Sequence, residues 1–270
     1  MSKQIHVGTA HWQMPKQYSH GFLDKGSHLE RYASVLNAVE INSSFYKEHQ
    51  QKTYERWRDS VPADFKFSVK VSHIFTHELE LNVSFDLLKE SISRILALQS
   101  KLGVLLVQLP PHLDFKVHDV ADFFNKLRKL YHGPIAVEPR HYTWLRPEAL
   151  ELMRELKLSK VFADPAPCPL ELKDSPLSGV TYFRLHGTPV IYKSDYPKTL
   201  LQELARDFKE LPHKNIWCVF DNTTYGYATK NALDLSASLG LRSVKSRGDD
   251  LLAWLNDLNN QPPDSGHGLL

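Results

Sequence analysis

Short runs of apolar and β-branched residues recur along the chain at intervals of roughly 30 residues, and helical patterns fill most of the intervals. The runs predict strands at residues 5–10, 38–42, 65–71, 103–109, 135–139, 160–164, 181–186 and 216–222. Strand and helix therefore alternate along the chain, which is the order expected for a parallel sheet covered by helices.

The intervals carry apolar residues at the spacing of amphipathic helices. This spacing holds, with Gln99 as one polar interruption, for Leu88, Ile92, Ile95 and Leu102, and throughout for Val117, Val120, Phe124, Leu127 and Tyr131 and for Leu201, Leu204, Phe208 and Leu211. Pro147 and Pro197 stand where a first helical turn tolerates the missing N–H group. We therefore expect crossover helices between the strands.

Eight strands alternating with helices in 270 residues predict an α/β fold of the (β/α)8 TIM-barrel class in a single domain. An open doubly wound sheet is the alternative. The segment VGTAHW at the end of the first strand lacks the glycine-rich phosphate turn typical of that fold. We assign residues 1–250 to the barrel domain and residues 251–270 to the end of a C-terminal helix and a loose tail.

Polar side chains gather at the carboxyl end of most predicted strands. Ala136, Glu138 and Arg140 share one face because side chains alternate along a strand. A (β/α)8 barrel builds its site at this end, where the loops after the strands converge. The sequence predicts a polar pocket there, made by Glu40, Lys70, Gln108, Glu138, Arg140, Asp164, Arg184, His186 and Asn222, with Trp12, Phe45, Tyr46 and Trp144 as walls.

The charged residues of this set have two interpretations, which differ most for Glu138. Barrel interiors also hold charged residues as satisfied ion pairs, and Glu138 with Arg184 is a candidate pair. Buried charges are costly unless something uses them, so the set as a whole favours a functional pocket. We expect Glu138 to lie in an open pocket that serves proton transfer or ligand binding.

Three other features indicate chemistry less strongly. His73 and His77 have the spacing of two metal ligands on a helix, but they follow a strand, and we expect them in a loop or behind the site. Cys218 lies in an apolar strand and is expected to be a core residue. The aromatic segment 45–57 is expected to be a lid or, preferably, a helix packed on the barrel.

Composition and charge narrow the classes of function. The chain is 42% hydrophobic, enough for a large core, and 33 basic against 31 acidic residues give a formal net charge of +2. This balance argues against a broad contact with nucleic acid or a membrane surface. Cys168 and Cys218 give neither a disulfide framework nor a zinc-finger spacing, and the N-terminus lacks a signal-peptide pattern. We expect a cytoplasmic protein without a bound metal or cofactor; the oligomeric state stays open.

The segments GTAHW, AVEINSSFY, FKFSVK, LLVQLPP, AVEPRHYTW, TYFRLHG and FDNT, with the pair Thr76 and His77, resemble in order and spacing the motifs of the YecE-like family, domain of unknown function 72. The resemblance runs from about residue 5 to about residue 240. It implies a TIM barrel whose activity is not established. It also implies that the barrel mouth is lined by Glu40, Asn42, Phe45, Tyr46, Lys70, Gln108, Glu138, Arg140, His141, Trp144, Arg184, His186, Gly187 and Asn222.

Two motifs depart from the family pattern. The first motif usually resembles G-T-S-G-W, whereas here Ala10 and His11 precede Trp12, which adds a titratable ring. The eighth-strand motif usually resembles F-N-N-T, and here Asp221 replaces its first asparagine. The new carboxylate either alters the charge balance of the site or faces outward.

The favoured function is an enzyme on a small anionic substrate, such as a phosphorylated sugar or a nucleotide fragment. Hydrolysis, lyase chemistry and isomerisation stay open. The alternatives are nucleic-acid binding or repair, by analogy with endonuclease IV-like barrels, and a non-catalytic ligand-binding barrel. We predict catalytic roles for Glu138, His186, Glu40 and Asp164. We predict substrate binding, with the anion held by the three basic residues, for Lys70, Arg140, Arg184, Gln108, Asn42, Asn222, Trp12, Tyr46, His141 and Trp144.

Overall fold

A computed structural model describes residues 3–175 and 178–241. Its strands are all parallel and form two sheets. One sheet has the order β1 (Gln4–Thr9), β9 (Asn215–Phe220), β8 (Thr181–Leu185) and β7 (Phe162–Asp164). The other has the order β2 (Ala38–Ile41), β3 (Lys66–Lys70), β4 (Leu102–Gln108), β5 (Ile135–Glu138) and β6 (Ser159–Lys160).

The two sheets adjoin at two places. Strands β6 and β7 are separated by Val161 alone, whose N–H donates to the Val137 carbonyl at 2.8 Å. Beyond β1, Ala10 forms a parallel bridge with Glu40 of β2. Gly8 permits this approach, because a Cβ built on it would lie 2.0 Å from the Ala38 carbonyl oxygen. The strands therefore follow one another as in a TIM barrel, and the predicted α/β class is confirmed. The predicted strand 160–164 differs in being divided at its second residue.

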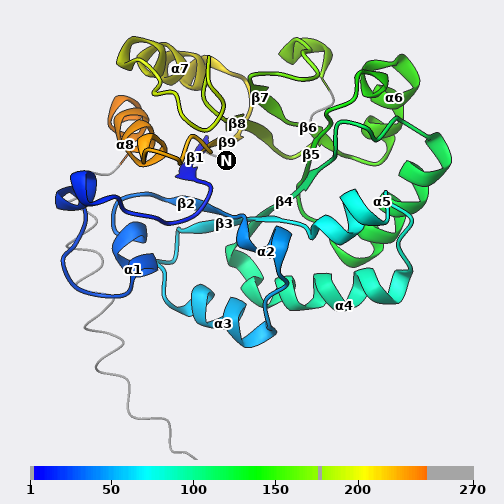
Figure 1. The fold of residues 1–270 in the computed structure, drawn as a ribbon, viewed down its shortest axis with the longest axis horizontal. Helices are drawn as coiled ribbons and strands as arrows, with labels where there is room; N and C mark the ends of the chain where they lie inside the picture. Colours follow the sequence, from blue (N-terminus) through cyan, green and yellow to red (C-terminus); the bar gives the residue numbers. More distant parts are fainter. Residues whose placement is uncertain (1–2, 176–177, 242–270) are drawn as a thin grey trace, which may run out of the picture.

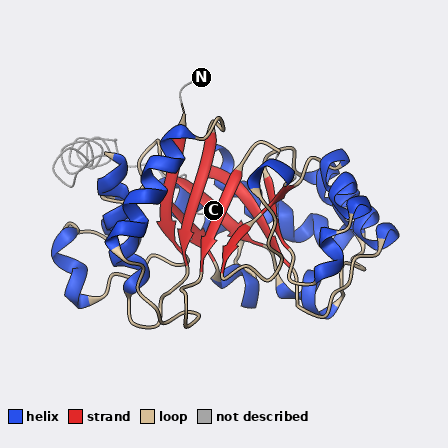
Figure 2. Ribbon diagram, turned by 90° about the horizontal axis from the view of Figure 1, so that it is seen from above, coloured by secondary structure: helices blue, strands red, loops and turns tan. Residues whose placement is uncertain are grey.

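Helices lie outside the strands, with α3 and α4 on one side and α7 and α8 on the opposite side (Figure 1). The view from above shows helices on both flanks of the strands (Figure 2). The α-helices are α1 (His28–Ala33), α2 (Ser43–Tyr46), α3 (Gln51–Asp59), α4 (Phe85–Ile95), α5 (Val117–Leu130), α6 (Pro147–Glu155), α7 (Lys198–Glu210) and α8 (Tyr227–Leu239). Short 3₁₀ segments cover Lys16–Gly21, Leu96–Lys101, Tyr142–Leu145 and Leu172–Asp174.

The predicted crossover helices are present, with differences at their ends. The helix predicted through Gln99 stops earlier: α4 ends at Ile95, and Gln99 has a φ of 50° inside the 3₁₀ segment that leads into β4. Pro147 is the first residue of α6, whereas Pro197 caps α7 from outside. His77 does not lie in a loop, because a π-helical turn covers Ile74–Glu78, and His73 is the N-cap residue of that turn. In the segment 45–57, the part from Gln51 onward belongs to α3 and has Tyr54 buried, whereas residues 47–50 are not helical.

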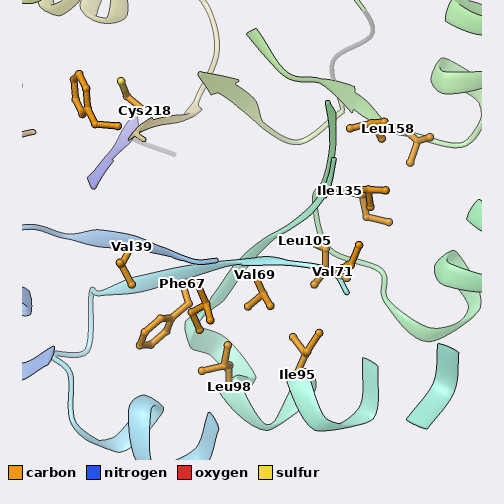
Figure 3. Close-up of a cluster of buried hydrophobic side chains, with 14 of the residues drawn as sticks. Val39, Phe67, Val69, Val71, Ile95, Leu98, Leu105, Ile135, Leu158 and Cys218 are labelled. Atoms are coloured by element: carbon orange, nitrogen blue, oxygen red, sulfur yellow. The ribbon is translucent and has the colours of Figure 1, made fainter. Parts of the chain in front are cut away.

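The main core lies between the strands and the outer helices. Figure 3 shows Ile95 and Leu98 pointing from their helical segments toward Phe67 and Val69 of β3. Cys218 is fully buried in β9, so the prediction of a core cysteine is confirmed. Alternation along the strands sends these side chains outward and leaves the next residue of each strand facing the interior.

A second apolar cluster fills the interior of the barrel near the amino ends of the strands. Its members include Val104, Leu106, Ala136 and Val219, and Tyr182 stacks on Trp217 with ring centres 5.9 Å apart. The interior is therefore packed and not open. Among the residues that the structure describes, no helix combines the length and apolar character needed to cross a membrane. The predicted C-terminal tail, residues 251–270, lies outside the described residues.

Candidate functional site at the carboxyl ends of the strands

Arg184 of β8 stands at the centre of a buried charged cluster. Its guanidinium binds Glu40 of β2, with Nη2 2.8 Å from Oε1 and Nε 3.1 Å from Oε2. The same guanidinium donates at 3.2 Å to Glu138 and forms an ion pair with Asp221, with Nη2 2.9 Å from Oδ2. Gln108 accepts a further bond at 3.3 Å. Four strands and the residue after β9 therefore meet at one cation.

His186 links two of these carboxylates. Its Nε2 lies 3.1 Å from Glu138 Oε1, and its Nδ1 lies 3.1 Å from Asp221 Oδ2. Arg140, just beyond β5, donates to the same Glu138 oxygen at 2.8 Å. Glu138 is only 1% exposed. Our expectation of an open pocket around this carboxylate is wrong: two guanidinium groups and an imidazole enclose it, which agrees with the buried ion-pair interpretation.

The protonation states follow from these contacts. Burial raises the pKa of Glu138, but the Arg184 charge outweighs burial and holds that pKa well below its ordinary value. The same balance lowers the pKa of Asp221. Burial lowers the pKa of His186, but hydrogen bonds to Asp221 and Glu138 outweigh it and raise that pKa. Glu138 is therefore ionised at neutral pH, and the two carboxylates bonded to His186 favour the protonated form of its imidazole.

Glu40 is bonded by Tyr182, which in turn contacts Ser68, and both of these residues were outside our predicted site. The Tyr182 hydroxyl donates at 2.9 Å to Glu40, and it lies 2.9 Å from the Ser68 hydroxyl. Their signal in the sequence was position: Tyr182 lies two residues before Arg184 on the same strand face, and Ser68 two before Lys70. Asp221 was also outside the predicted set, although the family pattern had marked it as a departure. It faces inward and takes part in the cluster.

Lys70, at the end of β3, is 4% exposed and lies beside the cluster. Its Nζ is 3.7 Å from the centre of the Phe45 ring. Burial and the neighbouring Arg184 charge lower the pKa of Lys70 to about 8. Within the described part of the chain, Nζ donates no hydrogen bond. The surroundings of Lys70 therefore disfavour its charged ammonium form relative to the neutral amine.

A cavity of about 370 Å³ opens next to the cluster and is lined by Arg140, His186, the segment 165–167, Ile191 and Tyr192. The Tyr192 ring stands edge-on to His186, with centres 5.9 Å apart. The volume lies in the range of small-molecule sites. A second hollow of about 430 Å³ is lined mainly by apolar side chains, including Phe162, Phe183 and Phe208, outside the barrel. It is remote from the charged cluster, and we regard the smaller cavity as the candidate site.

Several predicted site residues lie apart from the cluster. Asp164 accepts bonds from Tyr196 at 2.6 Å and Thr188 at 2.7 Å, and so holds the loop after β8. Trp144 is fully buried, and its indole N–H donates to the Leu113 carbonyl, so it is not a wall of an open pocket.

The remaining predicted residues lie around the rim or behind it. Asn222 bonds Asn231 at 2.8 Å and is fully buried. His141 bonds Thr143 at 2.8 Å, and Trp12 packs edge-on against Trp57. Tyr46 is 71% exposed, and Asn42 is buried with an Oδ1 that has no partner among the described residues. Their assignment to substrate binding stays a prediction.

The acidic residues of the cluster are arranged around a guanidinium and not around a metal site. Among the residues that the structure describes, no group of three or more His, Cys, Asp or Glu side chains is arranged to hold a metal ion. Glu40, Glu138 and Asp221 all point to the Arg184 guanidinium, which occupies the centre that a metal ion would need. His73 is committed elsewhere, with Nδ1 2.6 Å from the Phe45 carbonyl and Nε2 2.9 Å from Glu78.

The parallel α/β architecture and the charged cluster define a TIM-barrel-like protein with a candidate site in the barrel mouth. The profile of the family described as "Protein of unknown function DUF72" matches residues 6–251, and the chain belongs to this family. The resemblance found in the sequence motifs is thereby confirmed.

Two curated relatives support the assignment. UPF0759 protein YecE of Escherichia coli K12 is 31% identical over a region that covers 39% of this chain and 38% of that protein. The chain thus spans well under two thirds of the YecE protein that it matches. UPF0759 protein YunF of Bacillus subtilis 168 is 26% identical, with 75% of this chain and 83% of that protein covered.

Solved structures agree on the fold. A DUF72 family protein of Enterococcus faecalis V583 superimposes with a TM-score of 0.71 at 22% identity, covering 88% of this chain and 96% of that chain. A DUF72 family protein of Thermotoga maritima MSB8 superimposes with a TM-score of 0.69 at 25% identity, covering 88% of this chain and 99% of that chain. An L-ribulose 3-epimerase superimposes with a TM-score of 0.52 at 9% identity, covering 96% of this chain and 100% of that chain. The last likeness is one of fold alone.

Proposed function

We propose that this protein is an enzyme that acts on a small anionic substrate at the mouth of the barrel. The observation that carries the proposal is the buried cluster around Arg184, which meets a cavity lined by Arg140 and His186. Burying so many charges is costly, since replacing a buried ion pair by apolar residues is often neutral or stabilising. Clusters of perturbed titratable groups beside a cavity are typical of active sites.

Arg140 is the residue that we assign to the anion. Arg184 is 1% exposed and its guanidinium is enclosed by carboxylates, whereas Arg140 retains 21% side-chain exposure. Arg140 uses Nε and Nη2 to bind Glu138, and its Nη1 donates no hydrogen bond within the described residues. A guanidinium with free N–H groups facing a cavity suits a phosphate or carboxylate. The role of Arg184 is then to hold the carboxylates in place.

His186 is the residue that we assign to proton transfer. It lines the cavity, and its raised pKa favours the protonated imidazole that a general acid requires. Glu138 and Asp221 fix the orientation of the ring from both nitrogens. The general acid would lie next to the anion held by Arg140. Sugar chemistry is not carried over from the epimerase fold, because one fold serves many activities.

Thermal unfolding with inorganic phosphate tests the anion site. A ligand that binds only the folded protein stabilises it by about 2.7 kcal/mol at ~100 times its Kd. We expect phosphate to raise the unfolding temperature, and Arg140→Gln to abolish the rise. Arg146→Gln is the matched control, because Arg146 lies six residues further on, with an exposed side chain 4.0 Å from Glu148.

Two results would count against the proposal. If phosphate leaves the unfolding temperature unchanged, or if the Arg140→Gln and Arg146→Gln variants respond alike, the anion does not bind at Arg140. A single-stranded oligonucleotide that stabilises the protein more than phosphate does would favour the nucleic-acid alternative.

A further inference from the structure

We propose that Lys70 is a nucleophile that forms an imine with the carbonyl group of an anionic aldehyde or ketone. The inference rests on the proposed anion site and extends it, since it adds a substrate class and a covalent step. Arg140 would hold the anionic group while the carbonyl carbon reaches the Lys70 amine.

The position of Lys70 separates it from the ion pairs around it. Its Nζ lies over the Phe45 ring at 3.7 Å and donates no hydrogen bond among the described residues. The neighbouring carboxylates are directed elsewhere: Glu40 and Asp221 both lie 2.8–2.9 Å from Arg184 Nη2. An amine without a hydrogen-bonded carboxylate keeps its lone pair available once it loses its proton.

The environment of Lys70 also favours the neutral amine. Burial is the largest cause, the Arg184 charge adds to it, and together they lower the pKa to about 8. Roughly one tenth of such amines are neutral at pH 7, against a fraction of a thousandth for an ordinary lysine. A lysine desolvated or placed beside another cation is the usual form of a lysine nucleophile.

A neutral imidazole lies close by. His77 packs edge-on against the same Phe45 ring, with ring centres 5.0 Å apart. Burial, with the charges of Lys70, His73 and Arg140, lowers the pKa of His77 to about 4. His77 therefore stays uncharged at neutral pH and adds no positive charge beside the Lys70 amine. Lys70 ends β3 and Arg140 follows β5, and only β4 lies between these two strands, so both residues lie at the same end of the barrel.

The step balances without an oxidant or a further reactant. The amine lone pair forms the N–C bond, and the carbonyl π electrons move to oxygen. The oxygen takes up both amine protons and leaves as water, which gives the imine. Protonation of the imine nitrogen produces an iminium ion that draws electrons from the adjacent carbon. Hydrolysis reverses the sequence and returns the free amine.

Lys101 provides a matched comparison within the chain. Burial, with the charge of Lys66, lowers the pKa of Lys101 to about 8 as well. Its Nζ, however, donates to the carbonyl oxygens of Val61, at 3.0 Å, and Pro62. Hydrogen bonds of this kind hold the ammonium form in place. If a lowered pKa were sufficient, both lysines would react; if the geometry decides, only Lys70 reacts.

Borohydride trapping tests the proposal. The full-length protein is incubated with dihydroxyacetone phosphate, sodium borohydride is added to reduce any imine to a stable secondary amine, and the adduct is mapped by peptide mass spectrometry. We expect the adduct on Lys70 and none above background on Lys101. Lys70→Arg keeps the cation and should lose the adduct, whereas Lys101→Arg should keep it. Lys70→Met serves as a second variant should arginine disturb folding.

Each other outcome overturns the inference. Equal labelling of Lys70 and Lys101 would mean nonspecific reaction of surface and buried amines alike. Absence of an adduct on Lys70, while phosphate still raises the unfolding temperature through Arg140, would remove the covalent step and leave the proposed anion site standing. Loss of the phosphate response would instead remove the proposed function on which the inference rests.

Discussion

The inside of the barrel has two layers that differ in chemistry although the same strands build both. Near the amino ends the interior is apolar, and near the carboxyl ends it is charged. The change takes place within two residues of one strand face: Leu106 is followed by Gln108, Ala136 by Glu138, and Tyr182 by Arg184. Both layers are buried to a similar degree.

The apolar and the charged layer contribute differently to the stability of the fold. Burying apolar side chains stabilises the fold at about 25 cal/mol per Å² of area removed from water. Burying charges gains little after desolvation, even when every carboxylate has a cation beside it. Apolar residues fill the layer near the amino ends of the strands, so a barrel interior can be packed without charged side chains. The charged layer is the one that we connect with function.

Arg184→Gln should have the largest effect on stability. The substitution removes the cation shared by Glu40, Glu138 and Asp221, and it leaves buried carboxylates without compensation. We expect a loss of about 3–5 kcal/mol in the free energy of unfolding, measured with denaturant. Lys173→Gln, which removes an exposed partner of Glu171, should cost less than about 0.5 kcal/mol. Similar losses in the two variants would contradict a special role for the charged layer.

Leu106→Ala tests the apolar layer in the same strands. Leu106 is fully buried inside the barrel, and its truncation leaves a cavity. We expect a loss of about 2–5 kcal/mol, and a loss that does not vary with pH, because no titratable group changes its environment. Urea unfolding at several pH values measures both quantities. A strong pH dependence would show that the two layers are coupled.

Lys70→Met should change stability in the opposite direction. The lowered pKa of Lys70 means that the folded protein disfavours the ammonium, so removing the charge should stabilise it by about 1–3 kcal/mol at neutral pH. For the wild type, the unfolded state binds more protons between pH 8 and 10.5, and stability therefore rises with pH across that window. The gain of the variant should shrink over the same window. A destabilised variant at pH 7 would make Lys70 a structural cation.

Asp221→Asn should have the smallest effect, about 1–2 kcal/mol, because asparagine still accepts a hydrogen bond from His186. The raised pKa of His186 contributes stability that is fully present below 6.5 and lost as pH rises through the folded value. Without the Asp221 charge, that contribution falls. The cost of the substitution should therefore be larger below pH 6.5 than above the folded pKa, and NMR titration of His186 should show a lower pKa. An equal cost at both pH values would exclude this coupling.

The recurrence of strands and the spacing of helical residues determined the fold class from the sequence alone. The alternation of side chains also predicted that Glu40, Glu138 and Arg184 each lie on the polar face of their strand, because the backbone of a strand turns every second side chain to the same face. The ends of the strands and helices were harder to predict from the sequence, because the break at Val161 and the early end of α4 depend on how neighbouring strands and helices pack. The π-helical turn at Ile74–Glu78 carried no apolar periodicity by which it could be predicted.

For the site, the sequence determined which residues reach the barrel mouth, and only the tertiary structure decided which of them touch. Glu138 illustrates the difference. Its place at a strand end follows from sequence, but its enclosure by Arg140, Arg184 and His186 requires side chains from different strands to converge. The same convergence turned Asp221 inward and placed Asp164 against Tyr196, and within the described residues no carboxylate is hydrogen-bonded to the Lys70 amine. Distances between strands far apart in sequence are set by closure of the sheets, and no local pattern encodes them.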